Sequence, residues 1–301
     1  MNRLDSMSVL VAVVEAGSLS AASRKLKMPL PTVSRKVSEL ETHVGARLLI
    51  RSTRKLTLTE AGEAYVAACR RILEDVAEAE RGASGEYSAP KGELTVTAPI
   101  VFGRVHVLPV TAEFLKAYPD VDVRLVLADR LLNLQDEHLD VALRIGELPD
   151  SSLVAMRVGE TRRVVCASPA YLAKRGTPKN PQDIPKHDCV MFAGLMGPAN
   201  WPFTDAGAER ALPIHARLVV NTAEAAIDAA IAAVGLTRVY SYQVDAAVKA
   251  GALTIVLKKF EPAPAPISLL YNGQRLLPQK LRAFLDYAAP RLRARLAALR
   301  A

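Results

Sequence analysis

The sequence predicts a chain in two parts, an all-α N-terminal segment and a larger C-terminal α/β region. Apolar residues recur at helical spacing in the first part, whereas short apolar runs alternate with amphipathic helices in the second. Charge divides the chain in the same way. Residues 1–60 hold ten Lys/Arg and five Asp/Glu, a net of +5, while residues 61–90 hold three and six, a net of −3. A basic N-terminal module of this kind favours a polyanionic partner.

Three helices are expected before residue 45. Leu4, Leu10 and Val14 share one helical face, Gly17 suits the position after a helix end, and Ser18 can cap the next helix. A break at residues 27–29 precedes a third helix from about Pro31 to His43. Two helices joined by a tight turn, the second with hydroxyl and basic side chains outside, match a helix-turn-helix, whose second helix enters the major groove.

A β-wing is expected next, because Leu48–Ile50 and Leu56–Leu58 flank a basic tip that can reach phosphates. The pattern therefore predicts an N-terminal all-α winged helix-turn-helix. Its predicted DNA contacts are Ser18, Ser20, Leu30, Pro31, Thr32, Ser34, Arg35, Lys36, Ser38, Arg51, Arg54 and Lys55. The alternative is that these side chains form only a solvated face.

A long linker helix is expected from residue 60 to about Ala83, with Thr59 as its cap. Apolar residues step along it by alternating fours and threes, which indicates a coiled-coil seam for a second copy of the chain. The predicted dimerisation residues are Tyr65, Cys69, Ile72, Val76 and Ala79. The alternative is that the stripe packs on the chain's own body. Residues 82–92 have the composition of a hinge.

The C-terminal region is expected to form two lobes with largely parallel sheets, joined by two crossing strands. Ligands in such folds bind at the carboxyl ends of strands and at helix N-termini, which favour an anionic ligand. The predicted ligand-binding residues are Thr97, Ala98, Pro99, Ile100, Phe102, Arg144, Gly146, Ser168, Asn221 and Thr222. Ser168 and Asn221 also suit helix caps, with Glu224 completing a capping box if Asn221 is the cap.

The chain resembles the LysR-type transcriptional regulator family across essentially its whole length. The resemblance rests on AVVEAGSLSAA (residues 12–22), VSR (33–35), LE (40–41), VGARLL (44–49), LTEAG (58–62), RIGELPDSSL (144–153), WPF (201–203) and VNTAEAA (220–226). It implies that the linker helix forms a dimer and that the C-terminal α/β domain has a two-lobed periplasmic-binding-protein-like fold. The sequence departs from the family at Pro29-Leu30, where the family often has Ser-Gln. The apolar Leu30 side chain suits contact with the methyl group of a thymine base instead.

The expected domains are residues 1–59 (DNA binding), 60–90 (linker and hinge) and 91–301 (effector binding). Lobe I is expected to comprise 91–161 and 267–301, and lobe II 162–266. The expected function is effector-controlled, sequence-specific transcription regulation. Expected partners are an interrupted palindromic operator in double-stranded DNA, a small-molecule effector, a second copy or pair of copies of the chain, and RNA polymerase as a further candidate.

The sequence has no motif for catalysis, metal binding or a cofactor, so we expect no enzyme, metal or cofactor. The start leads into an amphipathic helix, and no apolar stretch is long enough to span a membrane, so we expect a cytoplasmic protein without a membrane partner. Two alternatives remain. One is a two-lobed solute-binding protein, and the other is a redox-sensing regulator that uses Cys166 and Cys189.

Overall fold

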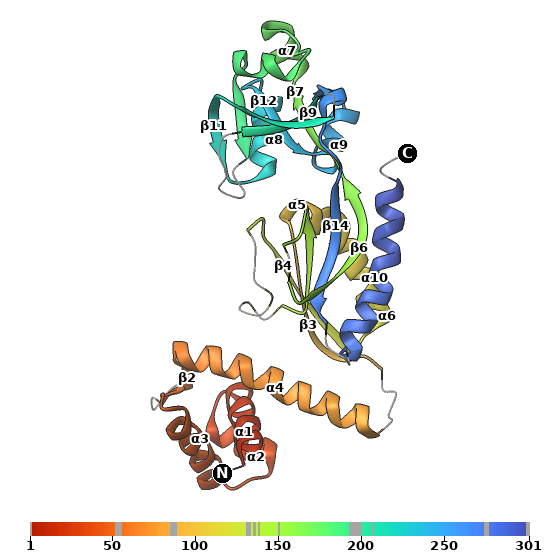
Figure 1. The fold of residues 1–301 in the computed structure, drawn as a ribbon. Coiled ribbons are helices and arrows are strands. Elements are labelled where there is room, and N and C mark those ends of the chain that lie inside the picture. Colours follow the sequence, from red (N-terminus) through yellow and green to blue (C-terminus); the bar gives the residue numbers. More distant parts are fainter. Residues whose placement is uncertain are drawn as a thin grey trace. The chain divides into compact units, whose positions relative to one another are not determined.

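The computed structural model describes residues 2–51, 56–84, 89–130, 134, 137, 139–149, 151–192, 200–205, 207–273 and 277–298. The chain divides into two compact units, Met1–Ser88 and Ala89–Ala301. Figure 1 colours the chain by sequence, so the helical unit is red to orange and the α/β unit is yellow to blue.

The N-terminal unit is a winged helix-turn-helix followed by a long helix. Its elements are α1 (Arg3–Ala16), α2 (Leu19–Leu26), α3 (Leu30–Val44), β1 (Leu49–Arg51), β2 (Leu56–Leu58) and α4 (Glu60–Ser84). Leu10, Val33, Leu40 and Leu48 are fully buried in its aliphatic core, so the three short helices and the first wing strand share one set of contacts.

Local signals set the turn between the helices. Gly17 ends α1 with φ 72°, and the Ser18 side chain accepts a hydrogen bond from the backbone N–H of Ala21. Both assignments confirm the sequence prediction. Between α2 and α3, Lys27 adopts the left-handed region with φ 50°, and the Ser23 hydroxyl donates to the Met28 carbonyl at 2.6 Å. These contacts hold the tight turn of the helix-turn-helix.

The long helix α4 begins at the wing. Thr59 Oγ accepts from the backbone N–H of Gly62 at 2.9 Å, which confirms Thr59 as the cap. Gly62 passes close to the first wing strand, since a Cβ there would lie 2.1 Å from the Leu48 carbonyl oxygen. Only glycine allows this approach. The 25 residues of α4 span about 37 Å at about 1.5 Å per residue.

Lobe I of the second unit is built on a five-stranded sheet with strand order β4-β3-β5-β14-β6. Its elements are β3 (Gly92–Ala98), α5 (Ile100–Phe102), the π-helix η1 (Gly103–Val107), α6 (Leu108–Ala117), β4 (Val121–Leu127), β5 (Val141–Ile145), β6 (Leu153–Thr161), β14 (Ala265–Asn272) and α10 (Gln279–Ala298). Phe102, Phe114 and Phe284 are fully buried, so α5, α6 and α10 share one core with the sheet.

Lobe II has a second five-stranded sheet, with order β11-β8-β12-β7-β13. Its elements are β7 (Arg163–Ala167), α7 (Pro169–Arg175), the 3-10 helix η2 (Pro181–Lys186), β8 (Cys189–Phe192), β9 (Asn200–Asp205), β10 (Ala208–Pro213), β11 (Ala216–Val220), α8 (Ala223–Ile231), β12 (Leu236–Tyr240), α9 (Ser241–Lys249), β13 (Thr254–Val256) and the 3-10 helix η3 (Lys258–Phe260). Strands β9 and β10 form an antiparallel hairpin whose Trp201 and Phe203 are buried in a lobe II core.

Two chain crossings join the lobes, as expected. Strand β6 continues through Arg162 into β7, and the chain returns from lobe II along β14 (Figure 1). The expectation of largely parallel sheets is wrong, because β14 and β6 in lobe I, and β7 and β13 in lobe II, pair antiparallel. The strands that cross between the lobes pair antiparallel with their neighbours, so each sheet contains both parallel and antiparallel pairs.

The helical segment after β3 begins at Ile100 and passes through the π-helical turn η1 into α6. Among the described residues, no single helix is long and apolar enough to cross a membrane; the bent pair α1 and α2 meets the length and composition criteria together.

Candidate DNA interface and effector site

The exposed face of α3 carries several of the predicted DNA contacts. Leu30 is 41% exposed, and Pro31, Arg35 and Ser38 are also exposed. Pro29 gives α3 no side-chain cap, so the described structure offers no side chain for the first N–H groups of this helix. Arg35 pairs with Glu39 at 2.9 Å one turn away. Such an exposed pair contributes only about 0–1 kcal/mol, so Arg35 can exchange Glu39 for a phosphate.

Other polar residues hold α3 in place. Lys36 forms an ion pair with Asp5 of α1 and is only 18% exposed, so its charge is engaged within the unit. Glu41 Oε1 accepts hydrogen bonds from the backbone N–H groups of Leu48 and Leu49, at 2.8 and 3.1 Å. One carboxylate therefore fixes the end of α3 to the first strand of the wing. Thr32 and Ser34 are half-buried, and Ser18 serves as the cap of α2 beside the exposed Ser20.

The wing is a short antiparallel pair in which Leu49 lies opposite Leu58 and Arg51 opposite Leu56. This confirms the predicted strands. The side chain of Arg51 and the whole of Arg54 and Lys55 lie outside the described residues, so their proposed phosphate contacts stay a prediction.

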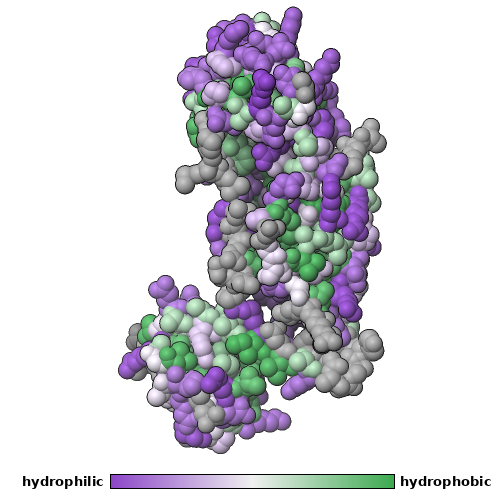
Figure 2. Space-filling view, viewed as in Figure 1, coloured by the Kyte–Doolittle hydropathy of each residue, from purple (hydrophilic) through white to green (hydrophobic). Residues whose placement is uncertain are grey.

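The seam of α4 divides into two parts. Cys69 is fully buried in the core of its own unit and so presents no surface to a partner, whereas the half-buried Tyr65 packs against that core. The stripe reaches the surface farther along, where Ile72 is 41% exposed and Ala79 is exposed. Figure 2 shows apolar patches among the polar surface of this unit.

Lobe I brings the predicted first-strand residues to the end of β3. Thr97, Ala98 and Phe102 are fully buried, and Ala98 and Phe102 share an apolar cluster with Ala223 and Tyr242 of lobe II. The end of β3 therefore meets the starts of α8 and α9. Thr222 caps α8, accepting from the N–H of Ala225 at 3.2 Å.

The other predicted residues near this junction have backbone roles. The N–H of Ile100 donates to Asp129 Oδ1 at 3.0 Å, and Gly146 has φ +114° and donates to the Pro266 carbonyl at 2.9 Å. Arg144 is 8% exposed and its Nη1 donates to the Leu143 carbonyl at 3.3 Å. Burial lowers the pKa of this guanidinium. Pro99 is half-buried.

Two predicted residues take other places. Ser168 follows β7, which runs antiparallel to β12. It therefore lies at the edge of the lobe II sheet opposite the carboxyl ends of the parallel strands β8, β11 and β12. It caps α7 and is 3% exposed. Asn221 is exposed and is not the cap of α8, because Thr222 takes that role. The rule that ligands meet carboxyl ends of strands holds for parallel strands only, and β7 departs from it.

Sequence reasoning missed four polar side chains at the lobe junction: His106, Asp129, Glu224 and Tyr242. Asp129 follows the end of β4, so the rule that selected Thr97 applies to it equally. His106 lies on η1, and π-helical turns often occur at functional sites. Tyr242 gave no signal, since its position depends on the packing of α9 against lobe I.

Burial dominates the electrostatics of these groups. It lowers the pKa of His106 to about 4, with Arg295 adding to the effect. Burial also raises the pKa of Asp129, the N–H of Ile100 opposes that rise, and the charge of Glu224 adds to it. The pKa of the Tyr242 phenol is raised well above its ordinary value, first by burial and then by Tyr240, Asp129 and Glu224.

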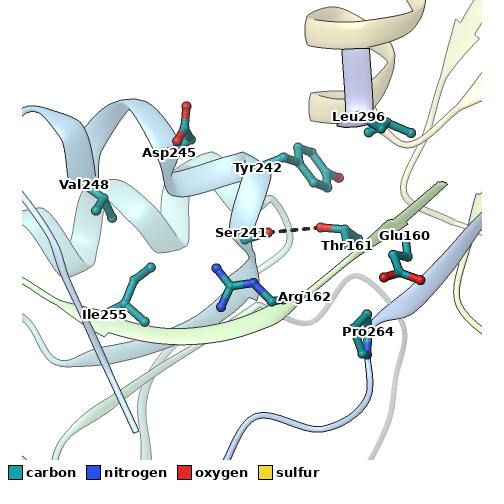
Figure 3. A pocket seen from close by; sticks show the side chains of 10 residues that line it. All are labelled: Glu160, Thr161, Arg162, Ser241, Tyr242, Asp245, Val248, Ile255, Pro264 and Leu296. Carbon is teal, nitrogen blue, oxygen red and sulfur yellow. Dashed lines mark hydrogen bonds between the residues drawn. The ribbon is translucent and has the colours of Figure 1, made fainter. Parts of the chain in front are cut away.

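A cavity of about 380 Å³ lies at the chain crossings between the lobes. Figure 3 shows its lining, in which Thr161 of β6 and Ser241 of α9 are hydrogen-bonded at 3.3 Å, with Tyr242 beside them and Leu296 of α10 nearby. A hydroxyl pair thus links the two lobes at the wall of a cavity.

The geometry does not favour a redox pair. Strand β12 lies between β7 and β8, with Thr237 opposite Cys166 and Leu236 opposite Cys189. Two strand spacings place the cysteines about 10 Å apart, beyond the roughly 7 Å that a disulfide spans. Burial raises the pKa of each thiol to about 12, and Asp188 adds to the effect at Cys189.

Comparison with known proteins agrees with both units. Residues 4–63 match the family described as bacterial regulatory helix-turn-helix protein, lysR family, and residues 88–293 match the LysR substrate binding domain. An HTH-type transcriptional regulator of Xanthomonas campestris is 36% identical over 96% of this chain and 85% of its own length. The HTH-type transcriptional activator AaeR of Escherichia coli K12 is 33% identical over 95% of this chain and 93% of its own length.

A solved structure extends the likeness to the fold. CrgA, a LysR-type transcriptional regulator from Neisseria meningitidis, is 32% identical and superposes with a TM-score of 0.61 over 96% of this chain and 98% of its own. A plain solute-binding protein would not explain the N-terminal match. The chain therefore belongs to the LysR family of transcription regulators, with a DNA-binding helix-turn-helix and an effector-binding substrate domain.

Proposed function

We propose that this regulator binds an interrupted palindrome in double-stranded DNA as a dimer or dimer of dimers, with α3 in the major groove. The observation that carries this is the exposed face of α3, anchored from behind by Lys36–Asp5 and by Glu41 at the wing. A rigidly supported helix can place base contacts with little loss of conformational entropy.

The proposal includes several finer points. The functional domains are residues 1–59, 60–90 and 91–301, and the last of these comprises the two lobes. The protein acts in the cytoplasm by binding rather than catalysis, and it alters transcription through RNA polymerase at the promoter. Family membership supports these points, because relatives along nearly the whole chain are regulators by name.

Arg35→Ala tests the DNA interface. If Arg35 contacts a phosphate, the variant should bind all duplexes more weakly, and the slope of log affinity against log salt should fall by about one. Fluorescence anisotropy of the full-length protein measures both. Arg217→Ala is the matched control, since it removes an equally exposed arginine from lobe II. An unchanged slope for Arg35→Ala would remove this residue from the interface.

Dimerisation is assigned to the exposed part of the α4 seam, namely Ile72, Val76 and Ala79. These residues follow the seam spacing beyond the point where α4 leaves its own core, and a second α4 would cover them. Ile72→Asp should shift the protein toward monomer by light scattering and weaken operator binding. Glu80→Lys, an exposed charge change off the seam, should leave the assembly unchanged. Persistence of the dimer in Ile72→Asp would contradict the assignment.

The effector is assigned to the lobe junction around Thr97, Phe102 and Thr222. A ligand that contacts both lobes stabilises one lobe arrangement over another, and so couples effector binding to DNA binding. Thr97→Val should abolish the change in DNA affinity that the host's small-molecule extract produces, while ligand-free DNA affinity stays unchanged. A normal response would place the effector elsewhere.

A further inference from the structure

Buried polar atoms without a hydrogen-bond partner gather where the lobes meet. Both ring nitrogens of His106 and Asp129 Oδ2 come from lobe I, and Glu224 Oε2 and the Tyr242 hydroxyl come from lobe II. Buried polar atoms are normally hydrogen-bonded, so each such atom needs an explanation. A group of them at one junction indicates that a bound molecule supplies the missing partners.

The two carboxylates approach the junction from opposite lobes. Asp129 is held by the N–H of Ile100 on its Oδ1, which leaves Oδ2 buried and without a partner. Glu224 lies in the first turn of α8, directly after Ala223, which packs in the same cluster as Phe102. Burial raises the pKa of Asp129, and the charge of Glu224 adds to this rise. The pair is therefore close enough to interact across the junction.

Tyr242 provides the second, independent observation. Its side chain is more than nine-tenths buried, and its hydroxyl has no partner within the described part of the chain. Its ring contacts Phe102 at 5.2 Å and His106 at 5.7 Å between centroids. The charges of Asp129 and Glu224 both act on this phenol. The Tyr242 hydroxyl is thus a buried polar atom beside the rings of Phe102 and His106 and within the influence of both carboxylates.

The arginines of this region have other surroundings. Arg295, whose charge acts on His106, donates to the Val105 carbonyl at 3.3 Å. Arg163 lies over the Tyr240 ring at 4.9 Å and donates to its hydroxyl at 2.9 Å. Arg238 lies opposite Val165, on the sheet face that the β9–β10 hairpin covers. Within the described residues, no ion pair neutralises Asp129 or Glu224. Each carboxylate has one buried oxygen without a partner, and an incoming cation would supply that partner.

We propose that the effector is a small organic cation whose N–H groups donate to Asp129 and Glu224 while its body packs on Phe102 and Tyr242. This inference rests on the proposed effector role of the lobe junction. Positive charge over aromatic faces adds cation–π attraction. Because one carboxylate belongs to each lobe, the cation bridges them and favours the closed arrangement. The helix N-termini favour anions, but the two carboxylates outweigh them.

Benzylamine and benzoate test the charge of the ligand, because they share a ring and carry opposite charges. Thermal unfolding of the full-length protein should show a dose-dependent rise in melting temperature with millimolar benzylamine and none with benzoate. Asp129→Asn and Glu224→Gln should each weaken the benzylamine response at least about tenfold, as loss of a buried charge-assisted contact predicts. Asp228→Asn, an exposed change in α8, should keep the full response.

Asp129→Asn retains an oxygen for the Ile100 N–H, so the variant should fold. Without ligand its melting temperature should equal or exceed that of the wild type, because an unpaired buried charge is gone. A lower melting temperature would assign Asp129 a structural role and overturn the proposal. So would stabilisation by benzoate alone, no response to benzylamine, or an unchanged response in both variants.

DNA affinity separates this inference from the proposed function. If the ligand-free protein binds duplex DNA normally but fails the benzylamine test, only the proposal of a cationic effector is contradicted. Protein that binds no duplex under any condition contradicts the proposed function, whatever the two probes do.

Discussion

Lowering the pH should destabilise the C-terminal unit through His106. This side chain is 4% exposed, and its folded-state pKa is about 4 against 6.5 for an exposed imidazole. Above pH 6.5 both the folded and the unfolded protein hold it neutral, so it has no effect. Below pH 6.5 the unfolded chain takes up a proton that the folded protein refuses. Stability is therefore lost as the pH falls, by about 2 kcal/mol at pH 5 and about 3 kcal/mol below pH 4.

His106→Phe isolates this contribution. The variant keeps a ring against Phe102 and Tyr242 but cannot take up a proton. Urea unfolding followed by circular dichroism, at pH 7.5 and pH 5, gives the free energy of unfolding for both proteins. The wild type should lose about 2 kcal/mol more than the variant between the two pH values. Equal losses would refute the assignment of a neutral, buried His106.

Three further predictions follow from local contacts. Gly62→Ala should destabilise the N-terminal unit by about 1–3 kcal/mol in thermal unfolding, because its Cβ meets the Leu48 carbonyl; an unchanged melting temperature would contradict the close approach. Glu41→Ala should cost about 1–3 kcal/mol and weaken operator binding, since two backbone N–H groups lose their acceptor; unaltered affinity would mean that the wing needs no such anchor. After mild peroxide, mass mapping should find no Cys166–Cys189 linkage, and a linked peptide would refute the strand order.

Much of the N-terminal unit could be predicted because its signals are local. Gly17, Ser18 and Thr59 each act within a few residues of their own position, so caps and helix ends follow from short motifs. The β9–β10 hairpin was missed because Pro202 stands between the alternating Trp201 and Phe203 and argues against a strand, and because its burial depends on contacts with the rest of lobe II.

Only part of the proposed effector site could be predicted from the sequence. The end of β3 follows from a general rule about parallel strands, whereas the direction of β7 depends on pairing with a strand more than seventy residues away. This is why Ser168 was misplaced. The junction residues Tyr242 and Glu224 come together with Asp129 only through the packing of one lobe on the other, which no local pattern encodes.

In vitro selection from randomised duplexes, using the full-length protein, tests the central claim most directly. If paired α3 helices read successive major grooves, the enriched sequences should contain two symmetry-related half-sites about 34 Å apart, or a multiple of that spacing. Arg35→Ala should bind these duplexes more weakly than the wild type does. No enriched half-site, together with equal binding by wild type and Arg35→Ala, would contradict the account.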